Sequence, residues 1–407
     1  MKQLATLLCG GVLLLGIVAC SDDEPQEPQS STASRTVLIY IGGENSLNSF
    51  IERNDGLGHD GDLVEMTEGA ADVPSNCNLI VYVDDVQLPR IYKLENIGGE
   101  GQCTLVKEYD EDSSSADPAV LRDVWKYVIA QYPAESYGMV MWSHADGWLP
   151  ANSTVDSRSI IIDNGNNTTS NAGAAMNIPA IKEVLQEVFG SQKLDFILWD
   201  ACFMQSIEVA YEMRNTAKWL IGSPAEIPGS GAPYHKIIKP MFASSTPDIE
   251  GIVYAYYSYY TDDSTYGALL SAIDTSHLEE LAKGTSPLLS YIESLGEKAT
   301  EDVFCYMPAF SSSYPAYHDI NGLMMKNLPT EQYTAWKQLL DKAVRYPMAT
   351  EWWYSNWRSH APTDFSQYCG LSMYVPAQIN GSESNRTRWN AYLKTLDWYK
   401  ATRTSAQ

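Results

Sequence analysis

The sequence contains the segments Tyr137-Gly-Met-Val-Met-Trp-Ser-His144 and Leu194-Asp-Phe-Ile-Leu-Trp-Asp-Ala-Cys202. Each is a run of mostly apolar residues that closes on one reactive side chain, a histidine in the first and a cysteine in the second. A buried parallel strand has this pattern when its carboxyl end opens into a site. We therefore predict two strands that bring His144 and Cys202 to the same edge of a sheet.

Outward from these segments, the first half of the chain alternates between strands and helices. Asp117 before Pro118, for example, is typical of a helix start. The alternation indicates an α/β domain with a mainly parallel sheet. The expected strands are residues 36–41, 78–83, 137–143, 159–162, 194–199 and 219–222, with a hairpin over 86–109, and the expected helices include residues 62–66 and cover 118–131, 178–189 and 204–214.

The second half has fewer reactive residues at its strand ends. Its pattern predicts helices at residues 249–260 and 276–294 and strands at 268–274 and 370–376. At 407 residues the chain exceeds one ordinary domain of about 150 residues. We interpret residues 36–232 as the α/β domain and residues 233–407 as a C-terminal α+β subdomain that extends and braces it.

The amino terminus is a targeting segment. Lys2 is followed by an apolar stretch over residues 4–18, which is too short to span a membrane as a helix. Ile17-Val-Ala-Cys20 resembles the cleavage site of a bacterial lipoprotein signal, so residues 1–19 would be removed and Cys20 would carry palmitate and other lipid. The alternative is an ordinary secretory signal with a coincidental cysteine.

The residues after the signal predict a lipidated tether over 20–35. Ser21-Asp-Asp-Glu24 resembles the surface-export tag of Bacteroidetes lipoproteins, and the Gln, Ser and Pro that follow are typical of a flexible linker. No later segment has about twenty uninterrupted apolar residues. We expect an outer membrane lipoprotein on the cell surface of a Bacteroidetes-type bacterium, bound to the membrane through its N-terminal lipid anchor.

The net charge of −24 excludes nucleic acid as a partner, because such a chain cannot displace counterions from phosphates. An acidic chain favours cationic substrates, although solubility of an exported protein explains the charge as well. We expect a monomer.

Five cysteines remain after the signal and the lipidated residue: Cys77, Cys103, Cys202, Cys305 and Cys369. An oxidising compartment would allow the pairs Cys77 with Cys103 and Cys305 with Cys369, and the alternative is that all five are free. In either case Cys202 has no partner.

His144 and Cys202 together suggest nucleophilic catalysis. A histidine near a thiol stabilises the thiolate, and the helix expected to begin near Met204 would add a partial positive charge. His144 would then protonate the leaving amine, and the N–H groups of Ala145 and Cys202 would form the oxyanion hole. Taken singly, each residue is more often structural. A metal site would need three or four close ligands, and the six histidines are scattered, so we predict no metal at this pair.

The same residues resemble a known family. Trp142-Ser-His-Ala-Asp-Gly-Trp148, followed by Asp200-Ala-Cys-Phe-Met204 and Glu208-Val-Ala-Tyr211, is similar to the clostripain family of cysteine peptidases, which have the caspase-like fold. Weaker agreement, including Asn45 and residues 62–66, extends the resemblance over residues 36–376. Residues 36–232 would then be a caspase-like catalytic domain.

The resemblance implies an endopeptidase that cleaves after Arg or Lys. In the family, the aspartate two residues before the nucleophile lies in the pocket for the basic side chain, and here it is Asp200. The alternative is that Asp200 caps the following helix. The chain departs from the family at Ala145, where glycine is usual, and at Ser230, where a second pocket carboxylate is expected and Glu226 is the possible substitute.

Two further properties follow from the resemblance. Family members are often activated by cleavage between histidine and cysteine, for which the polar loop offers Arg158. Some relatives respond to calcium, and Asp163-Asn-Gly-Asn-Asn167 could bind this ion weakly, although a solvated loop is the simpler account.

A different class of function is a surface binding protein for peptides or glycans that has lost turnover, with Trp352-Trp-Tyr354 and Trp357 as stacking platforms.

Overall fold

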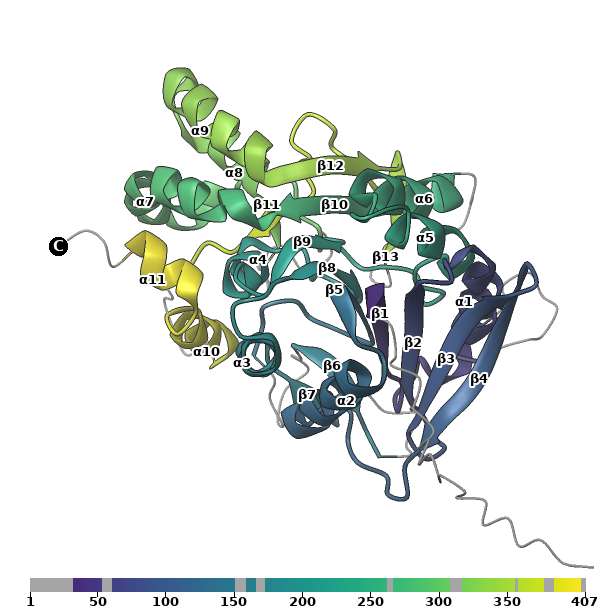
Figure 1. The fold of residues 1–407 in the computed structure, drawn as a ribbon. Helices are drawn as coiled ribbons and strands as arrows, with labels where there is room; N and C mark the ends of the chain where they lie inside the picture. Colours follow the sequence, from purple (N-terminus) through teal and green to yellow (C-terminus); the bar gives the residue numbers. More distant parts are fainter. Residues whose placement is uncertain are drawn as a thin grey trace, which may run out of the picture. The chain divides into compact units, whose positions relative to one another are not determined.

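The computed structural model describes residues 32–52, 61–150, 159–165, 173–261, 266–307, 317–355, 358–376 and 384–403. Thr32–Gln407 form one compact unit. Its centre is a nine-stranded sheet in the order β12-β10-β9-β8-β5-β1-β2-β3-β4 (Figure 1). The mainly parallel sheet that the sequence predicts is therefore confirmed.

Five parallel strands form the middle of the sheet, and antiparallel strands flank them on both sides. The middle strands are buried on both faces, which explains why their sequences are continuous apolar runs rather than alternating ones. The parallel strands are β1 (Ala33–Gly42), β2 (Cys77–Asp84), β5 (Ala134–Trp142), β8 (Leu194–Asp200) and β9 (Ala217–Gly222). The flanking strands are β3 (Arg90–Ile97), β4 (Glu100–Glu108), β10 (Leu269–Asp274) and β12 (Val344–Ala349).

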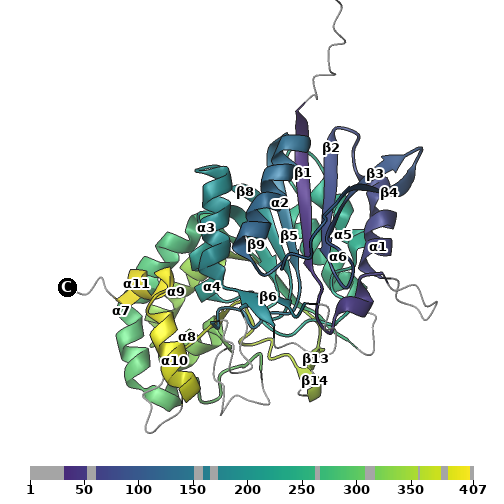
Figure 2. The same cartoon turned by 90° about the horizontal axis from the view of Figure 1, so that it is seen from below.

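Helices cover both faces of the sheet, and Figure 2 shows α2, α3 and α4 on one face and α1, α5 and α6 on the other. The predicted cap is present at the start of α2, where the Asp117 carboxylate accepts a hydrogen bond from the Ala119 N–H at 2.8 Å. The helices are α1 (Asp62–Gly69), α2 (Pro118–Gln131), α3 (Ile178–Phe189), α4 (Ile207–Met213), α5 (Tyr234–Met241) and α6 (Ile249–Thr261).

The second half of the chain completes this sheet, because β10 and β12 pair next to β9. A domain boundary at residue 232 stays a prediction. The strand expected over residues 370–376 is reduced to β15 (Ser372–Met373), since its only partner strand is the equally short β11 (His318–Asp319) and Gly370 bends the backbone with φ +79°. The remaining elements are β6 (Ile160–Asp163), β7 (Ala174–Met176), α7 (Leu278–Ser294), α8 (Ile320–Asn327), α9 (Thr330–Ala343), β13 (Trp352–Ser355), β14 (Arg358–Pro362), α10 (Ser384–Leu393) and α11 (Asp397–Arg403).

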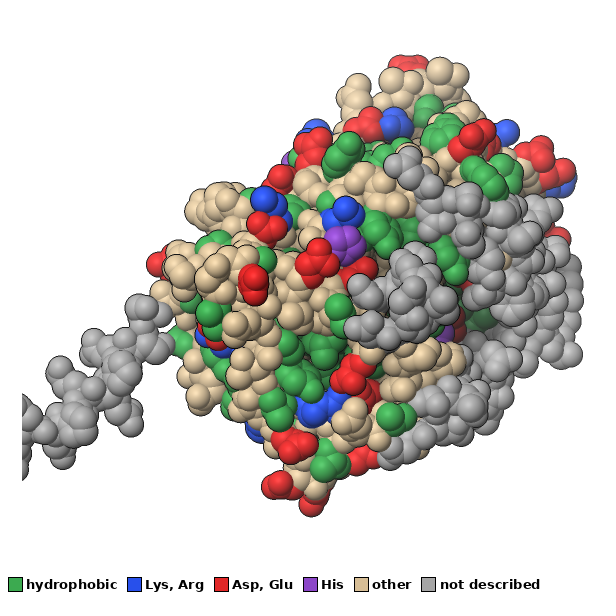
Figure 3. Space-filling view, turned by 90° about the vertical axis from the view of Figure 1, so that its right-hand side faces the viewer, with side chains coloured by type: hydrophobic (Ala, Val, Ile, Leu, Met, Phe, Trp, Pro, Cys, Tyr) green, Lys and Arg blue, Asp and Glu red, His purple; other side chains and the backbone are tan. Residues whose placement is uncertain are grey.

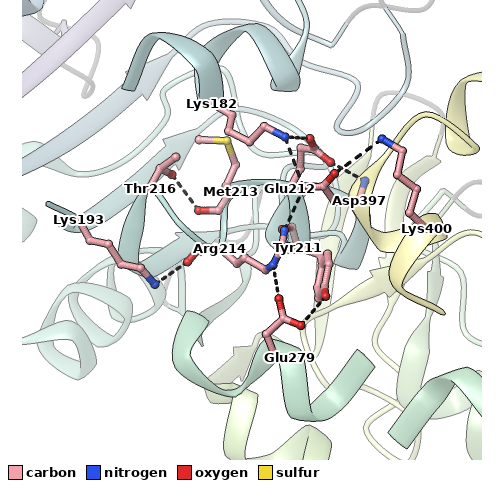
Figure 4. A network of polar contacts seen from close by, with 10 residues as sticks. All are labelled: Lys182, Lys193, Tyr211, Glu212, Met213, Arg214, Thr216, Glu279, Asp397 and Lys400. Atoms are coloured by element: carbon pink, nitrogen blue, oxygen red, sulfur yellow. Dashed lines mark hydrogen bonds and ion pairs between the residues drawn. The ribbon is translucent and has the colours of Figure 1, made fainter. Parts of the chain in front are cut away.

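A network of ion pairs joins α11 to the sheet-covering helices (Figure 4). Asp397 lies 3.1 Å from Arg214 and 3.4 Å from Lys182, and its N–H donates to Glu212 at 2.8 Å. Arg214 also pairs with Glu279 of α7 at 2.7 Å. Because these charges come from α3, α4, α7 and α11, the network fixes the end of the chain against the first half of the fold.

Another ion pair is buried near the starts of β1 and β8. Arg35 and Asp195 are 1% and 4% exposed, and the Arg35 Nε lies 3.1 Å from the Asp195 carboxylate. The guanidinium also donates to the carbonyl oxygens of Met241, Ser244 and Ser245. These bonds tie β1 to β8 and to the segment after α5.

We expect Arg35→Met to lower the free energy of unfolding by about 1–3 kcal/mol, because three backbone carbonyl oxygens lose their donor while Asp195 keeps Lys218 at 2.8 Å. Chemical denaturation measures the change. Arg122→Met is the matched control, since Arg122 pairs with the half-exposed Glu187 and should matter far less. Equal losses in the two variants would contradict the assignment.

All five cysteines of the described residues are free, so neither of the disulfides considered from the sequence forms. Cys77 and Cys103 lie on β2 and β4, and β3 runs between them. Two strand spacings amount to about 9–10 Å, which exceeds the reach of a disulfide. Cys305 and Cys369 are both buried, and each keeps its thiol.

Within the described ranges, no helix is both long and apolar enough to cross a bilayer. The face in Figure 3 carries acidic and basic side chains beside one another, with hydrophobic patches between them. On this face the acidic excess of the chain is interspersed with lysine and arginine rather than gathered in one patch.

Candidate active site

A cavity of about 230 Å³ lies at the carboxyl ends of β5 and β8. These strands are neighbours in the sheet, and Trp142 is in register with Asp200. His144 and Cys202 each follow two residues after this pair, and both line the cavity. The remaining lining residues are Leu47, Trp142, Ser143, Ala145, Asp146, Asp200, Phe203, Glu226, Ile227, Pro228, Gly229, Gly231 and Met307.

His144 is held from the loop that follows β1. The Ser46 hydroxyl and the His144 Nε2 are 2.9 Å apart, so this hydrogen bond orients the imidazole ring. The loop itself is fixed by Asn45, whose amide donates to the carbonyl oxygens of Gly42 at 3.0 Å and Ile162 at 2.8 Å. Asn45 is part of the family resemblance in the sequence. Nothing in the sequence points to Ser46, because a serine in a loop carries no distinguishing pattern.

Cys202 is not a thiolate at rest. Burial raises the pKa of its thiol to about 12, and the negative charges of Glu226, Asp146 and Asp200 act in the same direction. The Ile227 N–H donates to Sγ at 3.4 Å and offsets only part of this effect. The surroundings of Cys202 therefore favour the neutral thiol rather than the thiolate that the sequence suggests.

The helix that follows Cys202 begins too late for its dipole to stabilise a thiolate. α4 begins at Ile207 rather than near Met204, and the Ser206 hydroxyl caps it by accepting from the Val209 N–H at 3.3 Å. Four residues lie between Cys202 and the helix start, whereas the field of a helix end decays within one turn. The residues between form a turn instead of a helix.

That turn has a strained backbone directly after the cysteine. Phe203 has φ +60°, a conformation that a bulky side chain adopts rarely. Its ring stacks on Tyr317 with centroids 4.4 Å apart, and its N–H donates to the Ala225 carbonyl at 2.9 Å. The Tyr317 hydroxyl donates to the Asp146 carbonyl at 2.8 Å, so the turn of Cys202 and the loop of His144 share one support.

The two N–H groups predicted for an oxyanion hole border the cavity. Within the described residues, the N–H groups of Ala145 and Cys202 donate to no protein acceptor. Ala145 pairs with Ile160 of β6 as an isolated bridge, and the adjacent Asp146 N–H donates to the Ser159 carbonyl at 3.1 Å. These contacts fix the backbone after His144 and leave the Ala145 N–H without an acceptor. Alanine therefore fits at the position where the family that the sequence resembles usually has glycine.

Asp200 does not cap the following helix, since Ser206 performs that role. Its Oδ2 accepts from the Tyr234 hydroxyl at 2.7 Å and from the Ala232 N–H at 3.1 Å. Burial raises the Asp200 pKa to about 6, against the lowering effect of these two bonds. Oδ1 is buried without a partner in the described residues. Glycine is required at Gly231, because its φ is +59° and a Cβ would lie 2.7 Å from Oδ2.

The two other predicted pocket residues differ in position. Glu226 lines the cavity and accepts a hydrogen bond from the Ser355 hydroxyl. Ser230 does not line it among the described residues, although its neighbours Gly229 and Gly231 do. The Ser230 and Tyr260 hydroxyls are 3.1 Å apart.

Several predicted residues lie outside the described ranges, namely Cys20, Arg158, Trp357 and the end of the 163–167 stretch. The Asp163 carboxylate accepts from the Ser115 N–H at 2.8 Å. Asp84 accepts from the same N–H, and Glu44, Asp84 and Asp112 bring carboxylate oxygens within 4.8 Å of one another. Trp353 is 2% exposed and belongs to the core, whereas Trp352 is 41% exposed.

Comparison with known proteins agrees with this geometry. A sequence model of the clostripain family matches residues 39–406. Clostripain of Hathewaya histolytica is 26% identical over 227 residues, and the match spans 50% of this chain but only 41% of clostripain.

Solved structures extend the similarity over nearly the whole chain. A secreted C11 cysteine protease from Bacteroides thetaiotaomicron, in complex with an irreversible peptide inhibitor, is 32% identical with a TM-score of 0.76 and covers 92% of this chain and 100% of its own. An inactive zymogen C11 protease from Parabacteroides distasonis is 29% identical with a TM-score of 0.73 and covers 92% of this chain and 99% of its own. The chain therefore belongs to the clostripain family, a family of cysteine proteases.

Proposed function

We propose that the protein is a cysteine endopeptidase in which Cys202 is the nucleophile and His144 the general base. The observation that carries this proposal is the meeting of both side chains in one cavity at the ends of adjacent parallel strands. The solved relative from Bacteroides thetaiotaomicron that binds an irreversible peptide inhibitor supports the same reaction class.

The raised thiol pKa implies that the base acts during attack rather than before it. The His144 imidazole, held by its hydrogen bond to Ser46, accepts the proton as Sγ bonds to the substrate carbonyl carbon. The Ala145 and Cys202 N–H groups stabilise the resulting oxyanion. Imidazolium then protonates the departing amine as the C–N bond breaks, and water hydrolyses the thioester with His144 again as base.

The cavity favours a basic side chain on the substrate. Asp200 supplies a buried carboxylate with one unpartnered oxygen at the cavity wall, and a guanidinium or ammonium group would provide the missing donor. Glu226 adds a second negative charge at the rim. Cleavage after Arg or Lys is the preference that these charges support.

A peptide that ends in arginine and carries a cysteine-reactive group tests both parts of the proposal. We expect one covalent adduct on the wild type, located by mass spectrometry on Cys202, and slower labelling by a neutral analogue. Labelling at another cysteine, or a preference for the neutral analogue, would contradict the proposal.

Ser46→Ala should lower kcat/KM by about 2- to 10-fold, because the lost hydrogen bond to the imidazole is worth about 0.5–1.5 kcal/mol. The fold itself should be unaffected, so the unfolding midpoint stays that of the wild type. Ser136→Ala is the control, since the Ser136 hydroxyl donates to Ser34 at the far end of β5. If both serine variants lose activity equally, Ser46 has no particular role in orienting His144.

Export and processing complete the proposal. Cys20 would be lipidated and anchor the chain to the outer membrane at the cell surface, which mass spectrometry of the mature amino terminus can test. Cleavage at Arg158 would activate the enzyme, and the inactive zymogen among the solved relatives supports such control. Purified active protein that remains a single intact chain would argue against activation at Arg158.

A further inference from the structure

A second buried carboxylate lies behind Asp200. Asp62 begins α1 and is 2% exposed, and the Trp142 indole N–H is its hydrogen-bond donor. Trp142 lines the cavity and is in register with Asp200, whereas Asp62 is not a lining residue. Asp62 can therefore influence a bound side chain only through Trp142, through Asp200 or by its charge.

Each of the two carboxylates has one buried oxygen without a hydrogen-bond partner among the described residues. Asp200 Oδ2 already accepts two hydrogen bonds, so only Oδ1 is available to a substrate. Asp62 Oδ2 is likewise buried and has no partner in the described residues. An unpaired buried carboxylate is costly, and a guanidinium carries five N–H donors with a full positive charge. One such cation, bound at Asp200 Oδ1, would pair with that oxygen directly and would stabilise an ionised Asp62 through its charge.

The surroundings of Asp62 are acidic or phenolic. On its own helix, Glu65 accepts from the Tyr234 N–H at 3.0 Å and lies 3.2 Å from His235 of α5. Burial and the charges of Asp200 and Glu65 raise the Asp62 pKa well above its ordinary value. The nearby hydroxyls of Tyr234, Tyr256 and Tyr260 have raised pKa values as well and remain neutral.

We propose that Asp62 is a specificity-determining positioning residue that keeps its proton in the empty pocket and releases it to solvent when a cationic substrate side chain binds at Asp200. The inference rests on the proposed function, because it concerns the same pocket. A protonated Asp62 reduces the repulsion among the buried carboxylates of the folded protein. After it loses the proton, Asp62 adds a negative charge that favours a bound arginine.

The sign of the pH dependence follows from this exchange. Binding releases a proton, so affinity for a guanidinium should rise with pH, by up to about tenfold per unit for one proton. The rise should continue above the Asp200 titration near pH 6, because Asp62 still holds its proton there under this proposal. A peptide with citrulline in place of arginine carries no charge and should show no such slope.

The test compares the wild type with Asp62→Asn, which preserves the shape of the protonated side chain but cannot ionise. Calorimetry with ethylguanidinium in two buffers of different ionisation enthalpy counts the protons released, and peptide kinetics between about pH 6.5 and 9 give KM and kcat. We expect about one proton released by the wild type and none by Asp62→Asn. For arginine peptides, KM should rise about tenfold at the upper pH in Asp62→Asn, with little change in kcat.

Asp84→Asn is the matched control, since Asp84 is a buried carboxylate with an unpartnered oxygen at the end of β2. It should behave as the wild type. Equal proton release and equal KM in the wild type and Asp62→Asn, or no binding of ethylguanidinium by the wild type, would overturn the inference while peptide cleavage by Cys202 remains. Absence of any peptide cleavage, with guanidinium binding and proton release intact, would instead overturn the proposed function alone.

Discussion

Cys202→Ala should reduce peptide cleavage by at least about 10³- to 10⁴-fold, because Cys202 is the one cysteine among the described residues that line the cavity. His144→Ala should produce a loss of similar size, and the double variant should be no worse than either single one, since the two residues act as a unit. Steady-state kinetics with a fluorogenic arginine peptide measure these losses.

The fold is expected to survive both replacements. Cys202 lies in a turn whose geometry depends on Phe203 and its contact with Tyr317 rather than on the thiol. Cys77→Ala is the matched control, because Cys77 is also free and partly exposed but lies at the start of β2. Retention of more than about a tenth of the wild-type rate in Cys202→Ala would mean that the nucleophile is elsewhere.

Asp200→Asn should lower kcat/KM for arginine and lysine peptides by about 100- to 4000-fold, because removing one partner of a buried ion pair costs about 3–5 kcal/mol. Asparagine is preferred to alanine here, since its Oδ1 can still accept from the Tyr234 hydroxyl and the Ala232 N–H. The pocket should therefore keep its shape and lose only its charge.

Neutral peptides distinguish a variant that has lost only the Asp200 charge from one that has lost its fold. Asp200→Asn should cleave a citrulline peptide within about threefold of the wild-type rate, whereas a misfolded variant would lose both substrates. The wild type should also lose its preference for arginine as the pH falls through about 6, where Asp200 becomes protonated and can no longer pair with a cation. An unchanged arginine preference in the variant would refute the role of Asp200.

The sequence was sufficient for the sheet and for the residues at its edge. Apolar runs such as Leu194–Asp200 are long enough to identify buried strands, and parallel strands expose their carboxyl ends on one side. The cap at Asp117 and the hairpin expected over residues 86–109 are local signals that tertiary contacts did not override. His144 and Cys202 could be paired for the same reason, because adjacent strands in register bring equivalent positions together.

Tertiary packing decided the properties that depend on distant neighbours. The thiol pKa is raised rather than lowered, because burial and three carboxylates surround Cys202 and the helix that was expected to oppose them begins later. The Ser46 contact and the Asp62 carboxylate come from segments far away in the chain, and neither has a local pattern that reveals its partner. The same holds for the cysteine pairs, which proximity in sequence order allowed and the intervening β3 forbids.

The amino acid order alone thus determined which segments become strands and which reactive side chains stand at their ends, because hydrophobic periodicity acts over a few residues. Only the tertiary structure decided the protonation and the hydrogen-bond partners of these side chains and the burial of the acidic residues at the pocket. These depend on desolvation and on charges that residues from α1, α5, β5 and β8 bring within a few ångströms of Asp200.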